Sequence, residues 1–121
     1  MKDFTIMLED KPGSLAEVAT TLGNAGINIE GGCGFTAMGK GIFHLLVKEG
    51  GKAREVLEQA GIAIAEEKDV LVVSIENKPS ALATVSQKLA NAGINLDLFY
   101  IISFNRVALG VNDVEKARSV L

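Results

Sequence analysis

An internal repeat constrains the fold of this chain more than any other feature of its sequence. The repeat reads EDKPGSLAEVATTLGNAGINIE at residues 9–30 and ENKPSALATVSQKLANAGINLD at residues 76–97, and twelve of its 22 aligned positions are identical without a gap. Identity of this extent indicates two copies of one structural unit. A chain of 121 residues suits one ordinary domain or two very small units, and the repeat favours the second. We expect these units at residues 1–68 and 69–121.

The first copy shows the pattern of a mixed α and β unit. Residues 4–8 form an apolar run that predicts a strand, and the run stops at the polar turn of residues 9–13. Apolar residues at helical spacing predict a helix from Leu15 to Leu22, which Gly26 can end in the left-handed conformation. The remaining elements are predicted as a strand opening at residues 27–29, a hairpin turn at 38–41, a strand at 42–47, a helix at 52–60 and a last strand at 62–65. This β-α-β-β-α-β order is that of the ferredoxin-like unit.

The second copy repeats this order but ends early. Its elements are predicted as a strand at residues 70–75, a helix at 82–89 ended by Gly93, a strand opening at 94–96, a turn at Asn105-Arg106, a strand at 107–111 and a helix at 113–121. We therefore expect an α+β fold of two ferredoxin-like units in tandem, with antiparallel sheets, helices on one face, and no final strand in the second unit. An uncovered sheet edge favours pairing with a second copy, hence a homodimer. The alternative is a monomer in which the two copies cover that edge between them.

Charge, hydropathy and cysteine content exclude several function classes. The net charge is −3 and the pI about 5.1, without a basic stripe, so we expect no nucleic-acid partner. No apolar run approaches the roughly 18 residues of a membrane span, and the N-terminus lacks the apolar core of a signal peptide, so we expect no membrane partner. The single cysteine, Cys33, cannot form an internal disulfide, which favours a cytoplasmic protein.

The turn between the first strand and the first helix is the strongest candidate for a ligand site. Backbone N–H groups at a helix N-terminus attract a carboxylate, and Gly13 leaves space for a ligand to approach the backbone. Asp10 or Asn77 can accept hydrogen bonds from an ammonium group, while Asn28 and Asn95 offer both donors and acceptors. These groups suit a small zwitterion.

A plainer interpretation of the same turn is that Pro and Gly only shape it and that Ser14 only caps the helix. Other motifs are weaker. Residues 34–41 nearly match a phosphate-binding loop, but Gly41 stands where the magnesium-binding Ser or Thr is required, which favours a hairpin. His44 has no acidic or Cys partner near it in the sequence and is interpreted as structural, and Cys33 matches no nucleophile motif. We therefore expect no enzymatic activity, no metal and no cofactor.

The combination of DKPGSLA at residues 10–16, a helix, and AGINI at residues 25–29 resembles the ACT domain. This family comprises small ferredoxin-like regulatory modules that bind amino acids, and the resemblance covers both copies. In serine-sensing members, an Asn two residues before the Pro and an Asn sixteen residues after it hold the ligand. The matching positions are Asp10 and Asn28 in the first copy and Asn77 and Asn95 in the second.

The chain departs from that pattern in both copies. The first copy has Asp10 in place of Asn, and the second has Ser80 in place of Gly. The family's histidine four residues before the Pro is replaced by Leu8 and Ile75. The resemblance also implies that paired units set their sheets side by side and that the ligand lies where the first turn of one unit meets the other unit.

We expect, on this resemblance, an allosteric regulatory protein that binds a free amino acid and passes its effect to a separate enzyme or regulator. One alternative is a regulatory subunit that assembles with a separate metabolic enzyme without binding a ligand, and another is a small enzyme on the same scaffold. Apolar residues near the turns favour a small neutral amino acid. The expected ligand-binding residues are Asp10, Lys11, Pro12, Gly13, Ser14, Leu15, Asn28, Ile29, Asn77, Ser80, Leu82, Asn95 and Leu96.

Overall fold

The computed structural model describes residues 1–121 and divides them into two compact units, Met1–Lys68 and Asp69–Leu121. Each unit has its own sheet, its own pair of helices and its own apolar core. The predicted α+β fold of two ferredoxin-like units with antiparallel sheets is confirmed. None of the four helices is long and apolar enough to cross a membrane.

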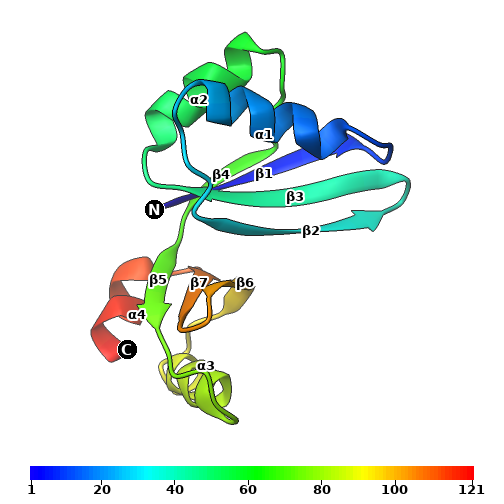
Figure 1. The fold of residues 1–121 in the computed structure, drawn as a ribbon. Coiled ribbons are helices and arrows are strands. Elements are labelled where there is room, and N and C mark those ends of the chain that lie inside the picture. Colours follow the sequence, from blue (N-terminus) through cyan, green and yellow to red (C-terminus); the bar gives the residue numbers. More distant parts are fainter. The chain divides into compact units, whose positions relative to one another are not determined.

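The first unit is a four-stranded sheet with two helices on one face (Figure 1). Its elements are β1 (Lys2–Glu9), α1 (Ser14–Asn24), β2 (Gly31–Ala37), β3 (Lys40–Val47), α2 (Gly50–Gln59) and β4 (Glu66–Asp69), and the strand order is β2-β3-β1-β4. In the antiparallel β1–β3 pair, Phe4 lies opposite Leu45. Because side chains alternate along a strand, Phe4 and Ile6 share one face, where they pack with Val18 and other core residues of the helices.

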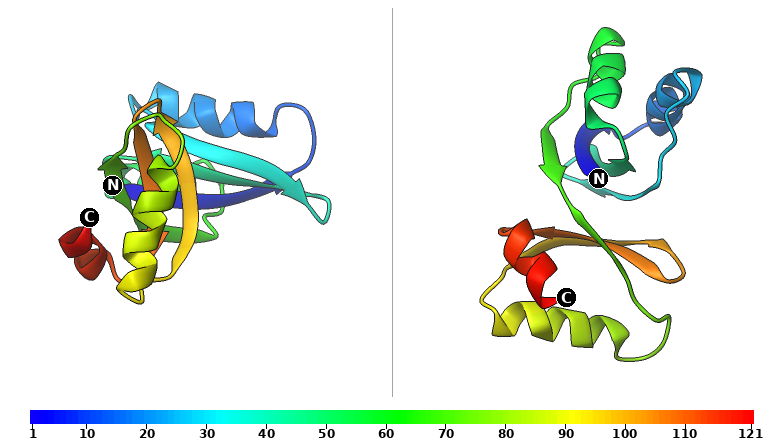
Figure 2. Two further views of the ribbon diagram at one scale, coloured as in Figure 1. Left: turned by 90° about the horizontal axis from the view of Figure 1, so that it is seen from below. Right: turned by 90° about the vertical axis from the view of Figure 1, so that its left-hand side faces the viewer.

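The second unit repeats this arrangement with three strands. Its elements are β5 (Leu71–Ser74), α3 (Ala81–Asn91), β6 (Leu96–Ser103), β7 (Arg106–Val111) and α4 (Val114–Val120), and the antiparallel strand order is β5-β7-β6. Both helices lie on one face of this sheet (Figure 2). Leu89 of α3 and Ala117 of α4 are buried against Leu109 of β7. The sheet has no fourth strand, in agreement with the sequence pattern.

The helix ends follow the glycines of the repeat. Gly26 and Gly93 adopt positive φ angles of 74° and 72°, as predicted. Beyond each glycine, the N–H of the next residue donates to a carbonyl of the last helical turn, from Ile27 to Leu22 (3.0 Å) and from Ile94 to Leu89 (2.9 Å). These bonds close the helix ends in the same way in both units.

Three predicted strand starts were wrong. The strands expected to open at Ile27 and Ile94 begin at Gly31 and Leu96, after the residues that close the preceding helices. The strand expected at residues 62–65 is instead β4, four residues later. The alternating pattern that suggested it has another cause, because Ile62 and Ile64 pack on the core from a loop. The observed strand is charged because it lies at the edge of the sheet, where charged side chains discourage further pairing.

The remaining boundaries differ from the predictions by one or two residues. The hairpin expected to turn at residues 38–41 turns at Met38-Gly39, and β3 begins at Lys40. The region that resembles a phosphate-binding loop is therefore a β-hairpin, as expected. In the second unit, the turn lies at Phe104-Asn105, so Arg106 is the first residue of β7 rather than a turn residue.

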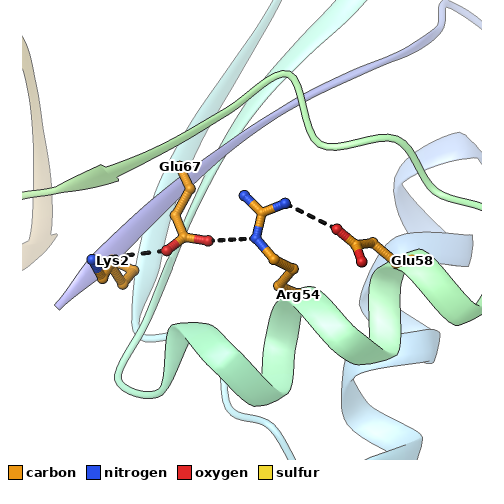
Figure 3. A network of polar contacts seen from close by, with 4 residues as sticks. All are labelled: Lys2, Arg54, Glu58 and Glu67. Carbon is orange, nitrogen blue, oxygen red and sulfur yellow. Dashed lines mark hydrogen bonds and ion pairs between the residues drawn. The ribbon is translucent and has the colours of Figure 1, made fainter.

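A polar network ties the charged edge strand to the first unit (Figure 3). Arg54 of α2 donates from Nε to Glu67 of β4 at 2.8 Å and from Nη1 to Glu58 at 2.9 Å. Lys2 of β1 lies 3.8 Å from the same Glu67 carboxylate. The guanidinium carbon lies 6.0 Å from the ring centre of Phe4. Hydrogen bonds to Glu67 and Glu58 raise the pKa of Arg54. The network therefore links β4, β1 and α2 at one end of the sheet.

Candidate functional site

The strand-to-helix turn of the first unit is a type II β-turn. The N–H of Ser14 donates to the carbonyl of Lys11 at 3.4 Å, which places Pro12 and Gly13 at the two central positions. Gly13 has φ 90° and ψ −12°, close to the values that this turn requires at its second central residue. A side chain at Gly13 would meet open space, with nothing within 4 Å. Backbone conformation therefore explains the glycine.

The second unit builds the same turn without glycine. The N–H of Ala81 donates to the carbonyl of Lys78 at 3.3 Å, and Ser80 takes the left-handed conformation with φ 72° and ψ −3°. A non-glycine residue in this conformation costs about 1–2 kcal/mol. The Ser80 hydroxyl makes no capping hydrogen bond, and in the first unit Gly13 rather than Ser14 occupies the N-cap position. The part of the plainer interpretation in which Ser14 caps its helix is therefore wrong.

One unit does not bring Asp10 and Asn28 together. Asp10 precedes α1 and Asn28 follows it. A helix of 11 residues is about 16 Å long at 1.5 Å per residue, which exceeds the reach of a single amino acid. Asn28 donates from Nδ2 to Glu30 at 2.6 Å and lines a cavity of ≈ 280 Å³ that also contains Lys48 and Lys52.

The corresponding pair of the second unit is separated in the same way. Asn77 precedes α3 and Asn95 follows this helix, which also has 11 residues. The backbone N–H of Asn95 donates to Oδ1 of Asn112 at 3.1 Å, so the segment after α3 is tied to the end of β7. Leu96, the first residue of β6, packs against the apolar core of this unit.

The other predicted residues of the first unit divide between two cavities. Lys11 and Ser14 line one of ≈ 340 Å³, where Lys11 forms an exposed ion pair with Glu9 at 3.2 Å. Leu15 and Ile29 line a mainly apolar cavity of ≈ 330 Å³ next to the glycine-rich strand β2. Pro12 and Gly13 lie exposed in the turn and line neither cavity.

In the second unit, the turn and the β6–β7 hairpin enclose a cavity of ≈ 140 Å³. Asn77 and Leu82, two of the residues that the sequence predicts for a ligand site, line it. Ser103, Phe104 and Arg106 of the hairpin line it as well, and the sequence analysis did not identify them. These residues lie more than 20 positions downstream of the turn, and only the pairing of β5 with β7 brings them beside it.

A part-buried polar cluster on β1 and β3 gives His44 partners that are distant from it in the sequence. Its Nδ1 atom lies 2.9 Å from Oδ2 of Asp3 and 3.3 Å from the hydroxyl of Thr5. Asp3 is only 1% exposed. Cys33 of β2 lies opposite His44 in the antiparallel register. His44 therefore has an acidic partner that lies far from it in the sequence, because the β1–β3 register joins residues 41 positions apart.

The same cluster affects the chemistry of Cys33. Burial, and then the negative charge of Asp3, raise the pKa of its thiol. A raised pKa lowers the fraction of reactive thiolate, which does not suit a nucleophile. No three His, Cys, Asp or Glu side chains are grouped in a way that could hold a metal ion.

Comparisons with known proteins agree with this architecture. A crystal structure of a protein from Bacteroides thetaiotaomicron superimposes with a TM-score of 0.87 at 30% identity, covering 99% of this chain and 85% of that one. The regulatory subunit of aspartate kinase from Thermus flavus gives a TM-score of 0.73 at 25% identity, covering 98% and 88%. The ligand-free regulatory subunit from Thermus thermophilus shares the fold, with a TM-score of 0.77 at 22% identity over 99% and 87%.

The comparison with curated proteins finds no match. The sequence profile of a family described as an ACT domain pair, by contrast, matches residues 1–121, which is the whole chain. Two copies of one turn, two copies of one helix ending and the same order of the three shared strands in the two sheets agree with this match. The chain therefore belongs to the ACT domain pair family.

Proposed function

We propose that the chain is a regulatory protein that binds a free amino acid at its strand-to-helix turns and transmits the level of that amino acid to a separate partner. The observation that carries this proposal is the match of an ACT domain pair to the whole chain. The turn has the same geometry in both units, and this supports the proposal. Ser80 keeps the left-handed conformation although that conformation is unfavourable for a serine, and backbone strain of this kind is typical of functional sites.

The proposed ligand is a small neutral amino acid. Apolar side chains follow both turns, namely Leu15 in the first unit and Leu82 in the second, and Leu15 shares its cavity with Ile29. Each turn and the Asn beyond its helix are about 16 Å apart, so a ligand that uses both kinds of position needs groups from a second ACT unit. Binding would then depend on how units assemble, which is a physical basis for regulation.

The proposed partner is a metabolic enzyme. Two of the similar structures are regulatory subunits of aspartate kinase, and we extend only the class of partner to this chain. A second candidate function, assembly with such an enzyme without any ligand, is favoured by exposed apolar side chains on the two hairpins. These are Phe35 (53% exposed), Met38 (102%), Ile101 (66%) and Phe104 (77%). Apolar groups exposed in this way are common at protein interfaces.

The three-stranded sheet supports a homodimer. In the first unit β4 covers the outer edge of β1, whereas no strand of the second sheet covers the matching edge of β5. Unpaired N–H and C=O groups on such an edge favour pairing with another chain. Sedimentation equilibrium at micromolar concentration tests this proposal. A mass of 12.7 kDa, rising neither with concentration nor with added amino acid, would contradict it.

A thermal-shift screen against the twenty amino acids tests the proposed binding function. A specific ligand at 100 times its Kd stabilises the folded chain by about 2.7 kcal/mol. We expect a shift with one or a few small neutral amino acids. A shift with arginine or glutamate alone would refute the proposed ligand class. No shift with any amino acid, together with capture of an enzyme partner, would favour the second candidate function.

A further inference from the structure

We propose that Arg106 binds the carboxylate of the amino acid and that the cavity of the second unit is the carboxylate-binding site of the pair. This inference rests on the proposed amino-acid-binding function and specifies which unit performs it. It starts from the ≈ 140 Å³ cavity between the β5–α3 turn and the β6–β7 hairpin, which Arg106 lines.

The hydrogen-bonding capacity of Arg106 is largely unused. A guanidinium carries five N–H donors, yet the side chain of Arg106 makes one hydrogen bond, from Nε to the hydroxyl of Ser103 at 3.4 Å. No carboxylate of the chain pairs with it. The acidic residue that lines the same cavity, Glu76, is engaged by Lys78 at 2.8 Å. Arg106 is partly buried, so a carboxylate bound in two-pronged geometry would meet a cation that is already partly desolvated.

The other walls of the cavity suit the remaining parts of a small amino acid. Leu82, Phe104 and Val107 supply apolar surface for its side chain. The amide oxygen of Asn77 can accept a hydrogen bond from its ammonium group. The volume of ≈ 140 Å³ is close to the roughly 150 Å³ of a protein cavity that holds one benzene molecule. A small aliphatic side chain fits this space better than a large aromatic one.

The first unit has no equivalent of Arg106. The repeat offset of 67 residues makes Ser74 the counterpart of Met7. Ser74 pairs with Arg106, whereas Met7 pairs with Ile42, so an apolar residue takes the place of the arginine. The difference arises in the hairpin. At the repeat offset of 67, the counterpart of Ile42 would be residue 109, but the residue that pairs with Ser74 is Arg106, so the hairpin of the second unit is three residues shorter. The shorter hairpin places an arginine beside the turn in the second unit only, whereas the turn lysine is common to both units.

Titration calorimetry on the full chain with each of the twenty amino acids, and with the α-amide of each one that binds, tests this proposal. The amide keeps the ammonium group and the side chain but removes the negative charge. We expect the wild-type chain to prefer the acid over the amide. Arg106→Gln should weaken binding of the acid by about 10- to 100-fold, as expected for a hydrogen bond to a charged group, and should abolish the preference. Arg106→Lys should retain part of the preference.

Lys40→Gln is the matched control, because Lys40 is the first residue after the hairpin turn of the first unit and carries the same charge. Its affinity should equal that of the wild type. Unchanged affinity and acid preference in folded Arg106→Gln would overturn this inference while leaving the proposed function intact. If Arg106→Gln does not fold, wild-type affinity in Arg106→Lys would overturn it. A wild-type chain that binds none of the twenty amino acids would overturn the proposed function and this inference with it.

Discussion

Replacing Ser80 with glycine should stabilise the protein. Ser80 occupies the left-handed region with φ 72°, and its hydroxyl makes no capping hydrogen bond that the change would remove. Its carbonyl still accepts from the N–H of Thr84 at 3.0 Å whatever the side chain. Relief of the left-handed strain contributes about 1–2 kcal/mol. The greater freedom of glycine in the unfolded chain offsets about 0.4–1 kcal/mol of this. The net expectation is a gain of about 0.5–1 kcal/mol.

The reverse change in the first unit provides the mirror experiment. Gly13→Ala places a methyl group where nothing lies within 4 Å, so only its φ of 90° opposes the substitution. We expect a loss of about 0.5–1 kcal/mol by the same arithmetic. Urea unfolding followed by circular dichroism measures both changes, and 1 kcal/mol corresponds to about 4–8 °C in Tm for a unit of this size. If Ser80→Gly destabilises the protein and Gly13→Ala does not, the account of the turn is refuted.

Two further predictions concern the first unit. Gly32→Ala should lower the free energy of unfolding in urea by about 1–3 kcal/mol, because the new Cβ would overlap the backbone carbonyl oxygen of His44. Gly23→Ala, inside α1 with open space around it, should raise the same free energy by up to about 1 kcal/mol. Equal effects of the two substitutions would contradict this account. The rate of Cys33 alkylation against pH should give a midpoint above the ordinary value of about 8.5, because burial and Asp3 raise its pKa. Asp3→Asn should lower that midpoint, and a wild-type midpoint below 8.5 would disprove the stated cause.

The parts of the fold that were predicted correctly depend on local sequence. The repeated turn, the helical spacing from Leu15 to Leu22 and the glycines at helix ends each act within a few residues of chain. The alternation at Ile62 and Ile64 predicted a strand that is not there, since a loop that packs on a core shows the same alternation as a strand.

The parts that could not be predicted depend on pairing between distant segments. The contact of His44 with Asp3 requires the register of β1 against β3, and the position of Arg106 requires that of β7 against β5. Asn28 was grouped with Asp10 because both match one ligand site in related proteins. The intervening helix separates them within a unit, so matching two motif positions does not place them around one ligand. Hairpin length, which decides the position of Arg106, cannot be derived from the repeat.

Direct calorimetric titration of the wild-type chain with the amino acid that raises its Tm most tests the central claim. We predict saturable binding, with one ligand per chain if Arg106 in the second unit supplies the carboxylate contact, and much weaker binding of the corresponding amide. If none of the twenty amino acids gives saturable heat at concentrations up to about 10 mM, the free energy of binding is less favourable than about −3 kcal/mol for each of them. That result would contradict the claim that this ACT domain pair binds an amino acid.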